Sequence, residues 1–368
     1  MNKYDVIGLM SGTSLDGLDI AYIQFFHEND WKYKIMQCET ISYAEELSTK
    51  LVHATKLSAS ELKKLDIEFG KWMGQEVKQF MNRHQIHPDL IASHGHTIFH
   101  QPEIGFTQQI GDGYQIMIAT GIKTIGDFRS LDVALGGHGA PLVPIGDMLL
   151  FKEFDFCLNF GGFSNISFES SGVRIAYDIC PVNTVLNYVA SQLNVPYDKG
   201  GEIAKSGAKN AELLQNLNAL SYYNQSPPKS LGIEWVQQNV YPLLDKDTPE
   251  NVLITYCHHI VQQIISSIVI ERHTAKFEPP LKMLVTGGGA KNSFLIDLLT
   301  KEVKGKVDII VPEDQLIDFK EAIIFAFLGL LRNLGMINTL KSVTGAKIDS
   351  SGGLIYDNLT ATSHQFDL

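Results

Sequence analysis

The most constraining feature of the sequence is a pair of apolar runs around a glycine turn, which occurs once in each half of the 368-residue chain. Residues 4–9 and 20–26 form the first pair, and residues 154–160 and 165–168 form the second. Two such runs joined by a polar turn that contains glycine predict a β-hairpin. Because strand and helix patterns alternate after each hairpin, the sequence predicts a duplicated α/β fold with a cleft between its halves.

Capping signals predict where two of the longer helices begin. Ser58 and Glu61 fit a capping box, in which each side chain bonds to the other residue's backbone N–H. Thr248 and Pro249 suit the N-cap and the first position of a long helix that ends near residue 273. The other expected segments are strands at 90–92, 281–285 and 308–311 and helices at 293–302 and 318–334.

The length of the chain predicts two domains, because a single core rarely grows to this size. We expect the boundary within residues 131–139. The predicted N-terminal lobe is residues 1–132 plus about 345–368, and the predicted C-terminal lobe is residues 133–344.

The charge and the cysteines indicate the compartment and the partners. A net charge of −11 argues against nucleic acid as a partner, which needs clustered lysine and arginine. The four cysteines have no metal-binding spacing, and their low number suits a reducing compartment. Neither a signal peptide nor a stretch of about 18 apolar residues is seen. The sequence therefore predicts a cytoplasmic protein with no membrane partner.

Three segments combine glycine with small polar residues after a strand, which lets backbone N–H groups approach a phosphate closely. Residues 8–19 are so rich in these types that phosphate binding is favoured over a plain hairpin turn, and Asp16 there can hold Mg²⁺. Residues 159–166 suit a ligand-free hairpin equally well. Residues 286–292 carry three glycines, more than a strand-to-helix turn needs, without the spacing of a P-loop or a dinucleotide fingerprint.

Several charged or imidazole side chains are candidates for substrate contact or catalysis. Arg129 lies between Asp127 and Asp132, where it suits either a bound carboxylate or a structural ion pair. Asp178 is a candidate general base only if it faces a cleft. The three histidines of residues 94–100 have no fourth ligand at a recognisable spacing, so hydrogen bonding near a polar ligand is favoured over zinc.

Together these segments resemble the anhydro-N-acetylmuramic acid kinase family, a branch of the sugar kinase, Hsp70 and actin superfamily. The resemblance covers almost the whole chain. Its most specific pieces are residues 10–19, 93–102, 126–144, 159–166 and 320–326.

The resemblance implies a two-lobed actin-like ATPase fold, of the ribonuclease H-like type, with a central cleft. It also implies ATP, Mg²⁺ and a homodimer. The implied reaction hydrolyses the 1,6-anhydro bridge of 1,6-anhydro-N-acetylmuramic acid and phosphorylates O6, which yields N-acetylmuramic acid 6-phosphate during peptidoglycan recycling.

The family's motifs extend to individual residues. The ATP-phosphate loop corresponds to Gly12, Thr13, Ser14, Leu15, Asp16, Gly17, Leu18 and Asp19. Asp178 matches the catalytic aspartate. Thr97, Asp127, Arg129 and Glu321 fall in segments similar to the sugar pocket. The other predicted nucleotide contacts, from the glycine turns above, are Gly161, Gly162, Gly287, Gly288 and Gly289.

The sequence departs from the family pattern at a few positions. Residues 179–183 read Ile-Cys-Pro-Val-Asn where the family often has Thr-Gly-Pro-Gly-Asn, and His96 and His138 stand where glutamine is common. Competing interpretations are a kinase for another 1,6-anhydro sugar such as levoglucosan, a non-catalytic ATP-binding module of the same fold, and an inactive homologue.

Overall fold

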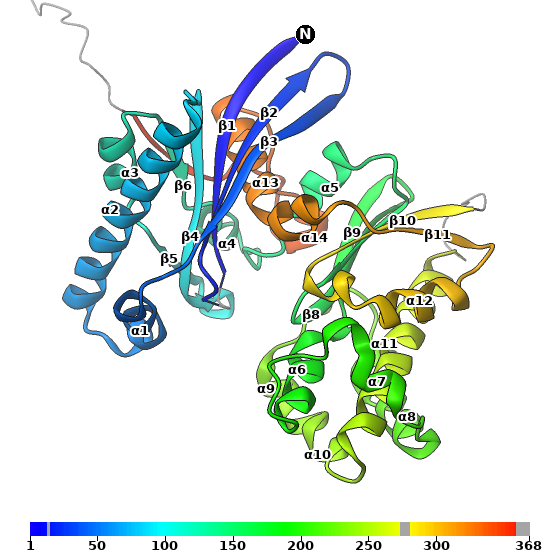
Figure 1. Ribbon diagram of the computed structural model, residues 1–368. Helices are drawn as coiled ribbons and strands as arrows, with labels where there is room; N and C mark the ends of the chain where they lie inside the picture. Colours follow the sequence, from blue (N-terminus) through cyan, green and yellow to red (C-terminus); the bar gives the residue numbers. More distant parts are fainter. Residues whose placement is uncertain (13–14, 273–279, 358–368) are drawn as a thin grey trace, which may run out of the picture. The chain divides into compact units, whose positions relative to one another are not determined.

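The computed structural model describes residues 1–12, 15–272 and 280–357 (Figure 1). Contacts divide the chain into two compact units, residues 1–150 with 321–368 and residues 151–320. The boundaries expected near residues 132 and 345 both fall inside the first unit. Residues beyond 132 belong there because they pack on its other elements: Gly146 lies so close to Ile324 that an added Cβ would be 2.8 Å from that side chain.

The first unit is built on a seven-stranded sheet with the order β12-β6-β4-β1-β2-β3, in which β5 pairs with β4. β1, β2 and β3 form an antiparallel meander, whereas β1, β4 and β6 are parallel. The strands are β1 (Asn2–Ser11), β2 (Leu18–His27), β3 (Trp31–Ile41), β4 (Leu90–Gln101), β5 (Phe106–Ile110), β6 (Thr124–Gly126) and β12 (Leu354–Tyr356).

Helices pack on both faces of this sheet. Side chains alternate between the faces of a strand, so Ile7 and Leu9 of β1 join the core with α2, while Gly8 faces α13. A Cβ on Gly8 would lie 1.9 Å from the carbonyl oxygen of Ala322, so only glycine lets α13 come this close. The helices are α1 (Glu45–His53), α2 (Ala59–His84), α3 (Gly113–Thr120), α4 (Ser130–Ala134), α5 (Pro144–Leu150), α13 (Asp314–Asn333, which starts in the second unit) and α14 (Lys341–Thr344).

The second unit repeats the topology of the first. Its five-stranded sheet has the order β11-β10-β7-β8-β9, which corresponds to β6-β4-β1-β2-β3. β7, β8 and β9 form the antiparallel meander, and β7, β10 and β11 are parallel. The strands are β7 (Phe156–Phe160), β8 (Phe163–Ser170), β9 (Val173–Pro181), β10 (Leu281–Thr286) and β11 (Val307–Ile310). The predicted duplicated α/β fold is confirmed.

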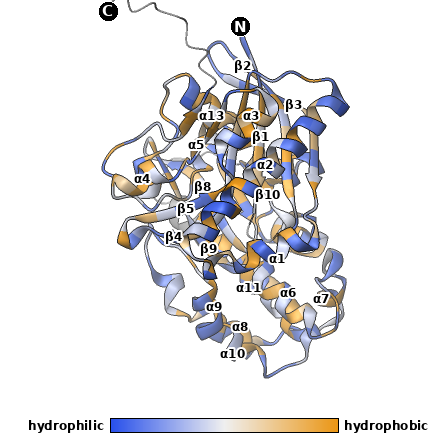
Figure 2. Cartoon of the chain, turned by 90° about the vertical axis from the view of Figure 1, so that its left-hand side faces the viewer, coloured by the Kyte–Doolittle hydropathy of each residue, from blue (hydrophilic) through white to orange (hydrophobic). Residues whose placement is uncertain are grey.

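The core of the second unit lies between its sheet and α11, where Tyr256, Cys257 and Ile260 are fully buried. Figure 2 shows hydrophobic residues along the strands and hydrophilic residues on the outer surfaces of helices. The helices of the second unit are α6 (Asn183–Ser191), α7 (Glu202–Ser206), α8 (Ala211–Asn218), α9 (Ile233–Asn239), α10 (Tyr241–Leu244), α11 (Pro249–Arg272) and α12 (Ser293–Glu302). Its 3₁₀ turns are η3 (Lys199–Gly201), η4 (Ser221–Asn224) and η5 (Gly288–Lys291), and those of the first unit are η1 (Ala54–Lys56) and η2 (Pro102–Ile104).

The capping signals of the sequence are observed. The Ser58 side chain accepts from the Glu61 N–H, and the Glu61 carboxylate accepts from the Ser58 N–H at 2.9 Å, so α2 begins with the predicted capping box. α11 begins at Pro249, as predicted. Within the described ranges, none of the helices has the length and apolar character needed to cross a membrane.

Candidate active site

The β1–β2 turn carries the predicted phosphate loop. Thr13 and Ser14 lie outside the described residues. The Leu15 N–H donates to the Gly12 carbonyl at 3.2 Å, and Asp16 is exposed, as a carboxylate that meets a metal–phosphate complex must be. Gly17 is required by packing, because a Cβ there would lie 2.6 Å from the Ile41 carbonyl oxygen.

Leu18 and Asp19, the last two predicted residues of that loop, are strand residues. Both belong to β2, where Leu18 is fully buried in the core and Asp19 accepts a hydrogen bond from the Thr40 hydroxyl at 2.6 Å. A ligand at this turn would therefore meet residues 12–17 first.

A buried hydrogen-bond chain supports the end of β1. The Tyr43 hydroxyl donates to Ser11 Oγ at 2.7 Å, and Ser11 Oγ lies 2.8 Å from His96 Nδ1. Burial lowers the pKa of His96, so its imidazole is neutral at pH 7. Among the residues that the structure describes, no group of three histidine, cysteine, aspartate or glutamate side chains is arranged to hold a metal.

A bulge in β4 brings His94 to Arg129. Leu9 pairs with Ser93 and Ser11 pairs with His96, so β4 contains one extra residue at this point. The Arg129 Nε and Nη2 groups lie 3.0 Å and 2.8 Å from His94 Nε2. Arg129 therefore bonds to a buried histidine rather than to either aspartate that flanks it in the sequence.

Arg129 also contacts the carbonyl of Gly139, to which its Nη1 donates at 2.6 Å. Burial lowers the pKa of Arg129 to about 10, and the negative charge of Glu321 acts in the opposite direction. Arg129 thus remains a cation at pH 7. Two of the predicted sugar-pocket residues, Arg129 and Glu321, therefore lie close enough for their charges to interact.

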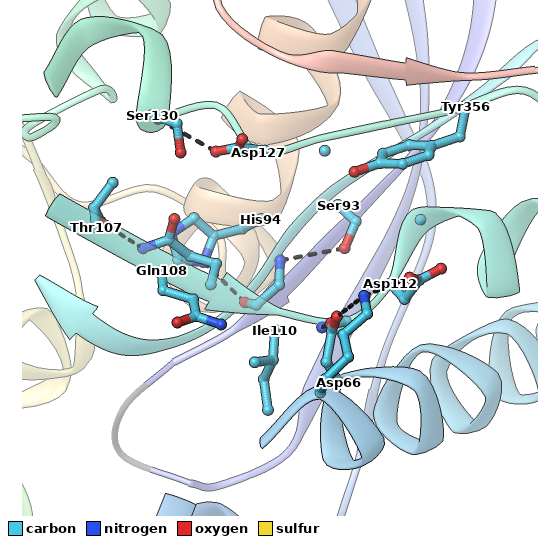
Figure 3. A pocket seen from close by; sticks show the side chains of 16 residues that line it. Asp66, Ser93, His94, Thr107, Gln108, Ile110, Asp112, Asp127, Ser130 and Tyr356 are labelled. Atoms are coloured by element: carbon cyan, nitrogen blue, oxygen red, sulfur yellow. Dashed lines mark hydrogen bonds and ion pairs between the residues drawn. The ribbon is translucent and has the colours of Figure 1, made fainter. Parts of the chain in front are cut away.

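Asp127 opens onto a cavity of about 200 Å³ in the first unit (Figure 3). Its backbone is left-handed, with a φ of 54°, and its Oδ1 accepts from the Ser130 N–H at 3.2 Å. Aspartate tolerates this conformation better than most residues. The cavity is lined by Lys63, Asp66, Ser93, His94, Gly95, Thr107, Gln108, Gln109, Ile110, Gly111, Asp112, Gly113, Gly126, Asp127, Ser130 and Tyr356.

Thr97 lies beside this cavity without lining it. Its hydroxyl accepts from Gln109 Nε2 at 3.4 Å, and the same nitrogen donates to Thr107 at 3.0 Å. Gln109 Oε1 is buried and, within the described ranges, has no hydrogen-bond partner. Thr97 is therefore linked to the cavity through Gln109, which lines it.

Two predicted glycine turns meet in the second unit, where the parallel strands β7 and β10 end. A Cβ on Gly287 would lie 2.5 Å from Asn159 Oδ1, and one on Gly289 would lie 2.7 Å from Phe160 Cβ. Gly288 differs, because its nearest neighbour would be Asn183 Nδ2 at 3.8 Å. The outer glycines are therefore needed for packing, while Gly288 is open to a ligand.

The β7–β8 turn also caps α6. The carbonyls of Gly161 and Gly162 accept from the N–H groups of residues 182–184 at 2.8–3.3 Å, so the first turn of α6 is already satisfied. The N–H groups of Gly161, Gly162 and Gly288 have no acceptor in the described part of the chain. These N–H groups are among the donors available to an anion here.

The different roles of Gly288 and Gly287 give a matched test. We expect Gly288→Ala to fold normally and to weaken ATP binding about tenfold, because its methyl group would occupy open space at the turn. Gly287→Ala should instead lower the melting temperature by several degrees, because of its φ of 81° and the contact with Asn159. Calorimetry of ATP binding and thermal unfolding of both variants check this, and equal melting temperatures would contradict it.

Asp178 lies on β9 next to a bulge. Asn165 pairs with Asp178 and Ser164 pairs with Cys180, so Ile179 is the extra residue. Asp178 Oδ2 accepts from the Leu231 N–H at 2.9 Å, and its other oxygen, Oδ1, has no partner among the described residues. Burial raises the pKa of Asp178, partly offset by the Leu231 hydrogen bond.

The backbone of Asp178 is held as well. The Tyr222 hydroxyl donates to its carbonyl at 2.6 Å, and its N–H donates to the Lys229 carbonyl at 3.2 Å. One carboxylate oxygen is thus anchored and the other is available, which is the arrangement that a general base needs.

A family model described as anhydro-N-acetylmuramic acid kinase matches residues 4–358, nearly the whole chain. The chain belongs to this family. It is therefore a kinase, as the sequence predicts.

Relatives of full length agree with the family model. Proteins called anhydro-N-acetylmuramic acid kinase from Actinobacillus pleuropneumoniae serotype 5b and Shewanella loihica are each 35% identical, over 97% of this chain and 100% of the relative. Component A of (R)-2-hydroxyglutaryl-CoA dehydratase from Acidaminococcus fermentans has a TM-score of 0.43 at 11% identity, over 89% of this chain and 97% of that one. Xylulose kinase from Rhodospirillum rubrum has a TM-score of 0.42 at 10% identity, over 91% of this chain and 90% of that one. Likenesses this low carry no weight for the fold.

The family motifs contain the candidate residues Arg129, Thr97 and Asp178, but they do not indicate which residues hydrogen-bond to them. The sequence singles out His94, which contacts Arg129, only as one of three clustered histidines. Gln109 lies on β5, a strand with no clear signal, and Leu231 follows a proline-rich stretch with no motif. The pair Gln108 and Gln109, between Phe106 and Ile110, is the one local sign of β5.

Proposed function

We propose that the protein uses MgATP to open the 1,6-anhydro bridge of 1,6-anhydro-N-acetylmuramic acid by hydrolysis while it phosphorylates O6. The products would be N-acetylmuramic acid 6-phosphate and ADP. Family membership supports the substrate. The observation that carries the chemistry is Asp178, a carboxylate with one anchored oxygen, one available oxygen and a raised pKa.

The glycine turns fit a nucleotide. The open side of Gly288 and the N–H groups of Gly161 and Gly162 offer the space and the donors that a nucleotide phosphate needs. Asp16 is the exposed carboxylate in the β1–β2 turn, which suits Mg²⁺ held jointly with phosphate oxygens. When bound, MgATP supplies the phosphoryl group that O6 accepts.

Asp178 would act on the water that opens the bridge. Its Oδ1 takes a proton from the water while the water oxygen bonds to C1 and the C1–O6 bond breaks. The Leu231 N–H keeps the carboxylate oriented during this step. Asp178 then releases the proton to solvent. O6, released from C1, would accept the γ-phosphoryl group of ATP, whose bond to ADP breaks.

Arg129 would bind the lactyl carboxylate of the sugar, with Asp127, Thr97 and Glu321 in the surrounding sugar-binding segments. The support is the charge of Arg129 and its contact with His94, which lines the same cavity as Asp127. Arginine suits this role because its planar group matches a carboxylate.

The cellular setting is also proposed. The product would belong to peptidoglycan recycling in the cytoplasm. All four cysteines are free, and Cys157, Cys180 and Cys257 are buried, which suits a reducing compartment. The homodimer rests on the family resemblance alone.

We expect an acid limb in the pH profile of kcat/KM. Asp178 must be ionised to act as a base, and burial raises its pKa, so activity should fall as the pH drops through a value above the usual 3.8. Initial rates from pH 4 to 9 measure this limb. A profile that stays flat down to pH 4 would contradict the assignment.

The substrate is tested by ADP release with three sugars: 1,6-anhydro-N-acetylmuramic acid, 1,6-anhydro-N-acetylglucosamine, which lacks the lactyl group, and levoglucosan. We expect the first to have the highest kcat/KM by at least about tenfold. Preference for levoglucosan would replace the proposed substrate, and no release with any of the three would contradict the activity.

A further inference from the structure

Arg129 uses three of its five N–H donors within the described part of the chain. Nε and Nη2 share the single lone pair of His94 Nε2, and Nη1 donates to the Gly139 carbonyl. One N–H therefore remains on each of the two terminal nitrogens, Nη1 and Nη2. Two such groups are what a carboxylate needs for two hydrogen bonds from one guanidinium.

The contacts of His94 leave a single protonation state. Its Nδ1 lies 2.9 Å from the Gly95 carbonyl oxygen, which can only accept, so Nδ1 carries the hydrogen. Its Nε2 faces two Arg129 donors and must therefore be the bare acceptor. Burial, and then the charge of Arg129, lowers the pKa of His94 well below its usual range, which is consistent with a neutral ring.

The backbone next to His94 requires a glycine. Gly95 has a φ of 73°, and a Cβ there would lie 2.5 Å from the Ile110 carbonyl oxygen, so glycine is required at the bulge. The His94 ring also packs on Phe325 of α13, with 4.5 Å between ring centroids. The ring is thus held by the Gly95 carbonyl and by Phe325 as well as by Arg129.

We propose that His94 is a positioning residue: its Nε2 turns the Arg129 guanidinium so that the two remaining N–H groups face the carboxylate of the sugar acid. This inference rests on the proposed function. It makes His94 a determinant of specificity for acidic anhydro sugars over neutral ones, although His94 itself need not touch the carboxylate.

Two substitutions separate the hydrogen bonds of His94. In His94→Gln the side-chain oxygen can occupy the place of Nε2 and accept from Arg129, whereas in His94→Asn the amide can occupy the place of Nδ1 and donate to Gly95. We expect His94→Asn to raise the KM for 1,6-anhydro-N-acetylmuramic acid about tenfold or more with kcat changed less than about threefold. His94→Gln should restore most of the affinity. The KM for ATP should be unchanged in both.

The coupling to Arg129 is tested by a double-mutant cycle. In an Arg129→Ala background, His94→Asn should raise the KM by less than about twofold, because the residue through which it acts is gone. His53→Phe, at an exposed histidine of α1, is the control that should leave the kinetics unchanged. The proposal is overturned if His94→Asn preserves the KM and His94→Gln does not. It is also overturned if the increases in KM caused by His94→Asn and by Arg129→Ala multiply in the double variant.

A second measurement keeps this inference separate from the proposed function. ¹⁵N-histidine spectra of the whole protein, with His94 assigned by difference from His94→Gln, should show hydrogen on Nδ1 and a bare Nε2 whose resonance shifts in Arg129→Ala. Hydrogen on Nε2 would overturn the inference even in an active enzyme. A wild-type protein with the expected spectrum but no turnover of any anhydro sugar would overturn the proposed function and leave the contact between His94 and Arg129 established.

Discussion

Replacing Asp178 with asparagine should lower kcat with 1,6-anhydro-N-acetylmuramic acid by about 10³-fold or more. The amide oxygen can still accept from the Leu231 N–H, so the local fold should persist. The amide has no basic oxygen for the attacking water. Steady-state kinetics give the loss, and calorimetry should show ATP affinity within about twofold of the wild type.

Asp308→Asn is the matched control, because Asp308 is an exposed aspartate of the same unit on β11. It should leave kcat unchanged. The stability of Asp178→Asn adds a second check. Because burial raises the pKa of Asp178 in the folded protein, the folded state loses stability as the pH rises through that pKa and the carboxylate ionises. The variant carries no such charge, so at pH 8 it should melt at or above the wild-type temperature. Equal losses of turnover and ATP binding would contradict the assignment of Asp178 as the base.

Arg129→Ala should raise the KM for the sugar acid by about 100-fold, because two charge-assisted hydrogen bonds to the carboxylate are lost. Arg129→Lys keeps the positive charge but not the planar group, so its KM for the sugar acid should lie between those of the wild type and Arg129→Ala. The kcat/KM for levoglucosan, which has no carboxylate, should change by less than about threefold. Kinetics with both sugars measure the difference.

Loss of Arg129 also leaves His94 and the Gly139 carbonyl without their donor, so folding must be checked by thermal unfolding. A folded Arg129→Ala enzyme whose KM for the sugar acid is unchanged would show that the carboxylate binds elsewhere. A proportional loss with both sugars would show that Arg129 supports the site as a whole.

The parts of the fold that depend on local pattern were predictable. Both hairpins, the α2 capping box and the start of α11 follow from turn residues and caps, and each is confirmed. The edge strand β3 is absent from the prediction: a bulge at Met36 interrupts the apolar–polar alternation that begins at Trp31. β12 has three residues and pairs with β6 more than 200 positions away, so no local signal marks it.

The glycine turns of the candidate site could be predicted because each directly follows a parallel strand. Glycine turns after parallel strands meet at one edge of a sheet, which brings residues 159–160 and 287–289 together at the ends of β7 and β10. The packing roles of Gly287 and Gly289 depend on Phe160, which is distant in sequence. The contact between His94 and Arg129 spans 35 positions and depends on a bulge, so sequence spacing suggests only a bound carboxylate or an Asp–Arg pair for Arg129.

The central claim is coupled hydrolysis and phosphorylation, and mass spectrometry of the product formed from 1,6-anhydro-N-acetylmuramic acid and MgATP in ¹⁸O-labelled water tests it most directly. The product should be heavier by one phosphoryl group and one labelled oxygen at C1, and unlabelled product incubated in the same water corrects for slow exchange. A phosphorylated product that lacks the label and keeps its anhydro bridge would contradict the account.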